Sequence, residues 1–131
     1  MSRDRRKYFA WFGTVLIVAL CLWPKNLMPT SETSSKNPPH ADKVVHLAMF
    51  AVFGLLWMRV QPSSRSTAMF VFLAGVGLAI GTEVAQGLPL IARDPDPLDA
   101  LADVAGTVVG IALVMGAGDT LGVDSEADEV S

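Results

Sequence analysis

Four apolar blocks dominate the chain, and their lengths constrain its fold more than any other feature. They extend over residues 8–23, 44–60, 67–90 and 98–118. A membrane-spanning helix needs about 20 predominantly apolar residues to cross a hydrocarbon core about 30 Å thick. None of the blocks shows the alternating pattern of a membrane β-strand. The sequence therefore predicts an all-α membrane protein, a four-transmembrane-helix bundle.

The composition supports one membrane domain rather than a soluble one. Hydrophobic residues make up 51% of the 131 residues, which is high for a soluble domain of this size. Lys and Arg are scattered and form no basic stripe, so no nucleic-acid partner is expected. The membrane domain is expected over 1–118, with a polar loop at 24–43 and an acidic disordered tail at 119–131.

Basic residues predict the orientation. Arg3, Arg5, Arg6 and Lys7 precede the first block, which lacks a small-x-small cleavage site and is therefore interpreted as a retained helix. Cytoplasmic ends of membrane helices are enriched in Lys and Arg, and this count favours cytoplasmic N- and C-termini. The start of the second helix, the end of the third and the start of the fourth then meet the outer leaflet.

Ionisable and amide side chains gather at those three helix ends. Asp42 and His46, and likewise Asp99 and Asp103, are spaced i,i+4, while Glu83 and Gln86 are spaced i,i+3, so each pair lies on one helix face. A charge in the centre of a membrane helix costs about 2.5–3.5 kcal/mol. The candidate pocket residues are Asp42, Lys43, His46, Glu83, Gln86, Arg93, Asp99 and Asp103.

Small residues at four-residue spacing predict close helix packing. Ala102, Gly106 and Gly110 share a face of the fourth helix with Asp99 and Asp103. A second stripe lies roughly opposite Glu83 on the third helix and is expected to contact the first helix or a second copy of the chain in a homo-oligomer. It consists of Gly77, Gly81 and Ala85.

These motifs resemble the VanZ-like family of small bacterial membrane proteins. The resemblance rests on Asp42-Lys43-x-x-His46, Glu83-x-x-Gln86, Arg93, and Asp99-x-x-x-Asp103-x-x-Gly106-x-x-x-Gly110, over about residues 42–110. Asp103 stands where the family pattern has Asn. The resemblance implies a multi-pass cell-envelope protein in the cytoplasmic (inner) membrane of a bacterium. It implies antibiotic resistance, the teicoplanin-linked property behind the family name, less directly.

The first functional hypothesis is a binding or modulating protein. Its outer-leaflet pocket would hold part of a membrane lipid, a lipid-linked envelope precursor or an amphipathic, glycopeptide-like compound. A net negative pocket favours a cationic or metal-bridged head group, unless Lys43 and Arg93 point inward. In the purely structural alternative, Asp42 and Asp99 cap helices, and Asp94 and Asp96 lie in solvent. Lys43 and Arg93 extend to the membrane surface, and the remaining polar groups make interhelical hydrogen bonds: Glu83, Gln86, His46 and Asp103.

Two further hypotheses remain open. A membrane-embedded enzyme would use Glu83 or Asp99 as general acid or base, with His46 and the carboxylates around a divalent ion. The sequence offers no convincing nucleophile, phosphate loop or zinc-binding helix motif. No catalytic residue, metal site or cofactor is therefore assigned. The last hypothesis, a proton or ion pathway through a homo-oligomer, lacks ionisable residues in the inner half of the bundle.

Overall fold

The chain folds into four helices in a computed structural model that describes residues 1–24 and 40–129, with side chains described through 119. The expected all-α class is confirmed for these residues, whereas most of the expected polar loop at 24–43 lies outside them. The helices are α1 (Arg3–Cys21), α2 (Ala41–Met58), α3 (Arg65–Gln86) and α4 (Pro97–Glu129).

Three of the described helices are long and apolar enough to cross a membrane. These are α2, α3 and the Pro97–Asp119 part of α4. The basic cluster between Arg3 and Lys7 occupies the first turns of α1 and shortens its apolar stretch. Four spans were expected, and the structure supports three of them by length and composition. We conclude that the chain is an integral membrane protein.

Side chains cap the starts of α3 and α4. The Ser64 side chain accepts a hydrogen bond from the Thr67 N–H at 3.1 Å at the start of α3. Asp96 accepts one from the Leu98 N–H at 2.9 Å, and Pro97 takes the first position of α4, where its missing N–H costs nothing. Asp42 and Asp99 lie inside the first turns of their helices, so neither is the cap that the structural alternative requires.

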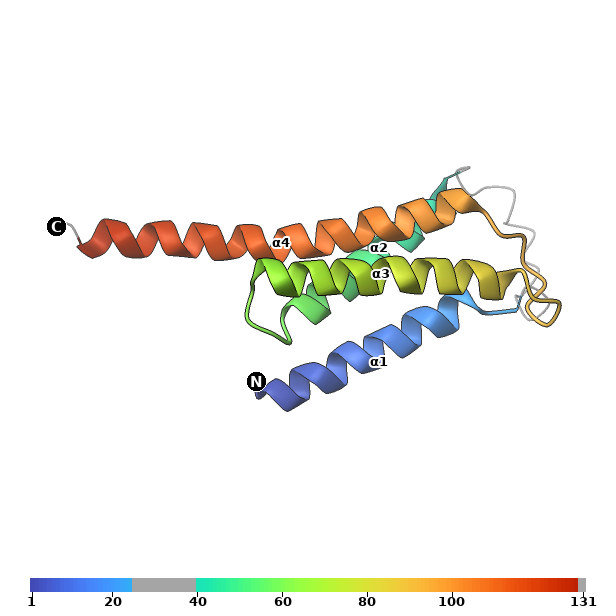
Figure 1. Ribbon diagram of the computed structural model, residues 1–131, viewed down its shortest axis with the longest axis horizontal. Coiled ribbons are helices and arrows are strands. Elements are labelled where there is room, and N and C mark those ends of the chain that lie inside the picture. The colour runs from blue at the N-terminus through green and yellow to red at the C-terminus, as the bar shows by residue number, and fades with distance from the viewer. Residues whose placement is uncertain (25–39, 130–131) are drawn as a thin grey trace.

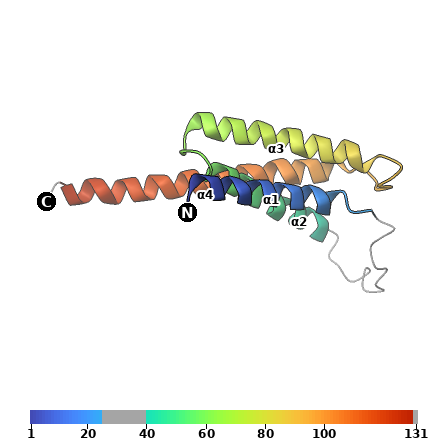
Figure 2. The same ribbon diagram turned by 90° about the horizontal axis from the view of Figure 1, so that it is seen from below.

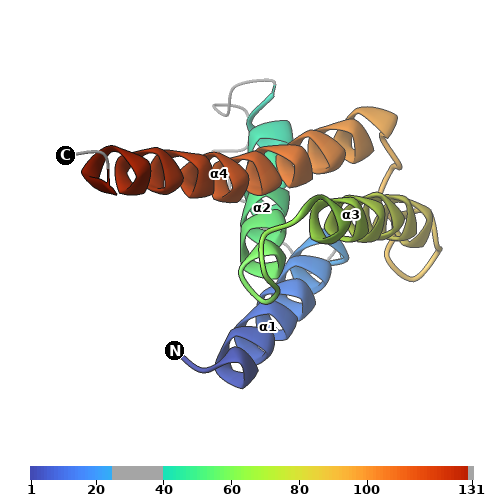
Figure 3. The ribbon, with the colours of Figure 1, turned by 60° about the vertical axis from the view of Figure 1, so that its left-hand side comes forward.

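The four helices form an up-and-down bundle in which α4 packs most extensively on α2 and next on α3. Neighbouring helices α3 and α4 run in opposite directions, and α1 lies on the side of α2 away from α4 (Figures 1 and 2). Figure 3 shows α4 crossing α2, with α1 near the other end of α2. The apolar core between the helices includes Phe50, Phe53, Met58, Val71 and Ile111.

Glycines bring α4 against the backbone of α2. A Cβ atom at Gly106 would collide with the carbonyl oxygen of Leu47, and one at Gly110 with that of Ala51. From the other helix, a Cβ at Gly54 would lie 2.6 Å from the carbonyl oxygen of Thr107. The third residue of the predicted stripe, Ala102, is half-buried.

The second small-residue stripe faces away from the bundle. Cβ atoms at Gly77 and Gly81 would meet no described atom within 4 Å, while Ala85 is half-buried. The described part of α1 therefore does not pack on this stripe. The glycine of α3 that does make a close contact is Gly75, where a Cβ would lie 2.6 Å from the Thr107 side chain.

The fourth helix is longer than the sequence suggested. It continues to Glu129, although the apolar block ends at 118 and an acidic disordered tail was expected. The extension contains Leu, Ala and Glu, which favour helix, and no Pro that would break one. In Figure 1, α4 consequently projects beyond the other three helices at the end of the bundle where both termini lie.

Candidate functional site

One end of the bundle holds every candidate pocket residue. The start of α2, the end of α3, the 87–96 loop, the start of α4 and the end of α1 lie together there (Figure 1). An up-and-down bundle requires this juxtaposition, because α3 ends where α2 and α4 begin. The contacts within this end decide which polar groups act together.

A buried pair joins α2 to α4. His46 Nδ1 lies 2.9 Å from Asp103 Oδ1, and the two residues are 5% and 1% exposed. When Asp103 is ionised, its carboxylate can only accept, and Nδ1 then carries the proton of this bond. The pair satisfies two polar groups that would otherwise be buried at a high cost.

Lys43 connects the same two helices closer to the bundle end. Its ammonium group lies 2.9 Å from Asp96 Oδ2 and 3.2 Å from Asp99 Oδ1. Asp96 belongs to the loop outside the apolar helices. The hydrogen bond from Lys43 holds the pKa of the Asp96 carboxyl below its usual range, and the bond from the Leu98 N–H acts in the same direction.

Two candidate pocket residues attach α1 to this end. Gln86 Nε2 and Arg93 Nη1 each donate a hydrogen bond of 2.9 Å to the Cys21 carbonyl oxygen. Cys21 is the last residue of α1, and the final carbonyls of a helix have no partner within the helix. A guanidinium at this position also complements the negative end of the helix dipole.

An unusual backbone conformation directs Arg93 toward α1. Ala92 has φ of 50°, in the left-handed region that residues with a Cβ atom seldom adopt. The loop thereby turns so that the Arg93 N–H donates to the Gln86 carbonyl at 3.2 Å, while the Arg93 side chain reaches Cys21.

One carboxyl oxygen of Glu83 has no described partner at this end. Its Oε1 is buried and has no hydrogen-bond partner among the described residues. Leaving a buried acceptor unpaired destabilises a folded protein by about 1–3 kcal/mol, and no described contact offsets this cost at Oε1. Glu83 also does not line the polar cavity at this end.

The polar cavity has a volume of about 210 Å³. Carboxylates predominate in its lining, and Lys43 is not part of it. Arg93 supplies the cationic group in the lining, and one of its nitrogens is bound to the Cys21 carbonyl. The lining residues are Asp42, His46, Gln86, Arg93, Asp94 and Asp99.

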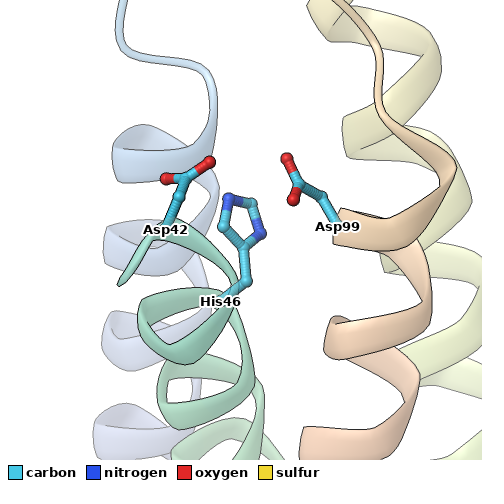
Figure 4. A group of neighbouring side chains, drawn as sticks. All are labelled: Asp42, His46 and Asp99. Carbon is cyan, nitrogen blue, oxygen red and sulfur yellow. The ribbon is translucent and has the colours of Figure 1, made fainter. Parts of the chain in front are cut away.

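Three of these residues converge on one point. Asp42, His46 and Asp99 each offer one ligand atom, and these atoms lie within 4.8 Å of one another. Figure 4 shows the His46 ring between the two carboxylates, with one ring nitrogen directed toward the space between them. Such a set of one imidazole nitrogen and two carboxylate oxygens could hold a divalent cation.

The sequence grouping differs from the observed contacts in several residues. Asp94 and Asp96 were set aside as solvated in the structural alternative, yet Asp94 lines the cavity and Asp96 binds Lys43. Their position just before the first turn of α4 is the sequence feature that could have indicated that they lie near Asp99. The acceptor at Cys21 is a backbone atom, which no side-chain pattern reveals. Ligand binding by the candidate residues stays a prediction.

Comparison with known proteins gives no match: no family model fits the chain, and no curated protein or solved structure is similar to it. The VanZ-like resemblance therefore stays a prediction, and the functional argument depends on the geometry.

Proposed function

We propose that this chain is a four-span protein of the VanZ-like type in the cytoplasmic membrane of a bacterium, with both termini in the cytoplasm. The outward-facing apolar side chains of α1 support the additional span. Phe9, Phe12 and Val15 are all exposed, and an apolar surface of this kind fits lipid better than water. The basic cluster before them supports a cytoplasmic N-terminus.

We further propose that the polar cavity binds the head group of a membrane lipid or of a lipid-linked envelope precursor. The observation that carries this proposal is a cavity lined by polar residues at the end of an otherwise apolar bundle. In a membrane of ordinary thickness, this end lies at head-group depth. The acyl chains of such a ligand would then lie against the apolar outer faces of the helices.

The charges in the cavity favour a cationic or metal-bridged head group. Asp42, Asp94 and Asp99 line it, and Arg93 is the cationic residue among the lining groups. Lys43 is turned to Asp96 and Asp99 instead of the cavity. A bare phosphate would therefore meet carboxylates, whereas a primary amine could donate to them in charge-assisted hydrogen bonds.

The cavity size limits what can enter. Pockets for drug-sized ligands measure about 300–1,000 Å³, and this one is smaller, at about 210 Å³. A whole glycopeptide does not fit in that space, but an amine group of a larger amphipathic compound does. The proposal therefore concerns a head group, and drug resistance does not follow from it.

Lipid retention tests the proposal. The full-length protein is purified in detergent, incubated with phosphatidylethanolamine or phosphatidylglycerol of matched acyl chains, and measured by native mass spectrometry. We expect preferential retention of the amine lipid, and about a tenfold loss in Asp99→Asn, the scale of one charge-assisted hydrogen bond. The control is Asp4→Asn, an exposed carboxylate in the first turn of α1 at the other end of the bundle. Equal retention by both variants would remove the cavity as the binding site.

One observation favours a membrane-embedded enzyme as a second candidate function. His46 is held by Asp103 on one nitrogen and borders the cavity, which is the arrangement of a general base with an orienting carboxylate. The described lining includes no Ser, Thr or Cys, so water would be the nucleophile. Release of a head group from a bound lipid by the wild type, abolished in His46→Gln, would establish this function.

A purely structural protein would show neither lipid retention nor release of a head group.

A further inference from the structure

We propose that Asp42, His46 and Asp99 bind a divalent transition-metal ion, with Asp103 as a positioning residue for His46. The inference deepens the head-group proposal and rests on the same cavity. It specifies how that cavity could accommodate a phosphate-bearing head group despite its carboxylates. A metal ion held by the carboxylates would also bind the phosphate and so separate the two negative groups.

The His46 ring supplies the first observation. The side chain is 5% exposed, and Nδ1 is occupied by Asp103 at 2.9 Å. With the proton on Nδ1, the neutral ring presents the Nε2 lone pair on its opposite side. Within the described chain, Nε2 has no hydrogen-bond partner, and the ring lies between Asp42 and Asp99 (Figure 4). A nearly buried histidine thus directs an unused acceptor into a cavity.

Asp103 completes an arrangement that is common around metal ions. Metal-binding histidines usually donate their second N–H to a carboxylate or carbonyl, which fixes the tautomer and makes the ligand nitrogen more basic. Asp103 makes this contact from α4 while it remains outside the cavity lining. Asp103 stands where the family pattern has Asn, and as a carboxylate it would place a negative charge behind the ligand.

The neighbouring charges leave two carboxylates available. Lys43 binds Asp99 through Oδ1, which leaves Oδ2 for a ligand. Asp42 makes no hydrogen bond or ion pair that involves another described residue, and Arg93 donates to the Cys21 carbonyl. A divalent cation between Asp42 and Asp99 would compensate their charges, which the bundle otherwise holds close together.

The ligand set fits zinc better than calcium or magnesium. Zinc accepts imidazole nitrogen and carboxylate oxygen together, and its functional sites use three protein ligands with an open position. Calcium and magnesium prefer oxygen ligands alone. Donor atoms of a tetrahedral zinc site are roughly 3.3 Å apart, so the observed 4.8 Å limit requires a small inward rotation. Asp42 is exposed in the first turn of α2 and has room to rotate.

Metal titration tests the inference without any lipid. Zn²⁺ is titrated calorimetrically into the full-length protein in lipid-free detergent. We expect one ion per chain, at least about a tenfold weaker affinity in His46→Ala and Asp99→Asn, and near wild-type affinity in two matched controls. The controls are His40→Ala, which replaces the other, exposed histidine, and Asp4→Asn, which removes an exposed carboxylate in the first turn of α1 at the other end of the bundle. Absent binding, or an equal loss in the controls, would overturn the inference.

A spectroscopic measurement covers variants whose folding is altered. Co²⁺ bound in place of Zn²⁺ gives visible d–d absorption that depends on its ligands, and we expect this absorption to disappear in His46→Ala. In Asp103→Asn we expect the bands to remain but shift, with affinity about tenfold weaker, because the amide replaces the charge behind His46. Unchanged bands and affinity in Asp103→Asn would exclude its positioning role. A wild-type spectrum that survives in His46→Ala would exclude His46 as a ligand.

Lipid binding with and without the ion separates the two proposals. If the ion bridges a phosphate, retention of phosphatidylglycerol rises with Zn²⁺ and falls with a chelator. Amine-lipid retention that persists without any Zn²⁺ binding would overturn the metal inference and leave the head-group proposal standing. Zn²⁺ binding without retention of either lipid would overturn the head-group proposal and leave the metal inference standing.

Discussion

His46 and Asp103 show at the scale of single residues how an apolar helix pair can tolerate two buried polar groups. Each group satisfies the other across the interface between α2 and α4 at 2.9 Å. Such a pair is stable only as a unit, because removing one partner leaves the other buried and unsatisfied.

Asp103→Ala should therefore destabilise the protein more than Asp103→Asn. The alanine leaves His46 without its acceptor and opens a space, at a cost of about 1–3 kcal/mol. Asparagine keeps an acceptor oxygen of similar size, and we expect a loss below about 1 kcal/mol. Equilibrium unfolding in mixed detergent micelles measures both, and equal losses would contradict the role of the hydrogen bond.

Asp96 predicts a pH dependence at the bundle end. Because its pKa is lowered in the folded protein, its contact with Lys43 stabilises fully above the unfolded-state pKa of about 4 and is lost as pH falls through the lower folded value. The unfolding midpoint of wild type should exceed that of Asp96→Asn near neutral pH, and the difference should vanish in acid. Asparagine keeps the helix cap, so charge alone changes. A difference that grows in acid would contradict the ion pair.

Sequence reasoning brought the polar side chains to one end of the bundle but did not identify the backbone groups that some of them contact. Helical spacing placed Asp99 and Asp103 on one face, and both are buried. The left-handed Ala92 and the Cys21 carbonyl contribute through the backbone, where side-chain identity carries no signal. These two features explain why Gln86 and Arg93 serve α1 as well as the cavity.

At the scale of helices, glycine placement decides which faces pack. Gly106 and Gly110 lie directly against α2, whereas Gly77 and Gly81 face open space. The four-residue spacing is the same in both stripes, so it predicts a face suited to close packing but does not identify the partner. The structure supplies that partner for one stripe.

Alanine substitutions should distinguish the two stripes. Gly106→Ala and Gly110→Ala place a methyl group against backbone carbonyls that cannot move aside, and should destabilise by about 1–3 kcal/mol. Gly77→Ala and Gly81→Ala meet open space and should be neutral, or stabilise by up to about 1 kcal/mol through helix propensity. Unfolding in micelles measures all four. Destabilisation at Gly77 or Gly81 that depends on protein concentration would instead indicate a homo-oligomer interface.

A helix boundary was predictable where a helix-breaking residue borders an apolar block. Pro97 marked the start of α4 to within one residue of the expected position. Its end moved to Glu129, because hydropathy marks where the apolar block stops and not where the helix stops. For the same reason, α1 begins at Arg3, within the basic cluster.

At the scale of the whole molecule, the order of the helices brings the polar ends together. Up-and-down connectivity places the start of α2, the end of α3 and the start of α4 at one end, with both chain termini toward the other (Figure 1). This much follows from the sequence once the blocks are interpreted as antiparallel helices. We propose in addition that the cavity opens at the outer face of the membrane.

Thiol labelling from outside tests that claim most directly. In a Cys21→Ala background, which removes the native cysteine, Asp94→Cys places a thiol in the cavity lining and Ser2→Cys places one at the opposite end. A membrane-impermeant maleimide added to intact spheroplasts should label Asp94→Cys, and should label Ser2→Cys only after the membrane is permeabilised. Labelling of Ser2→Cys in intact spheroplasts, with Asp94→Cys protected until permeabilisation, would contradict the account.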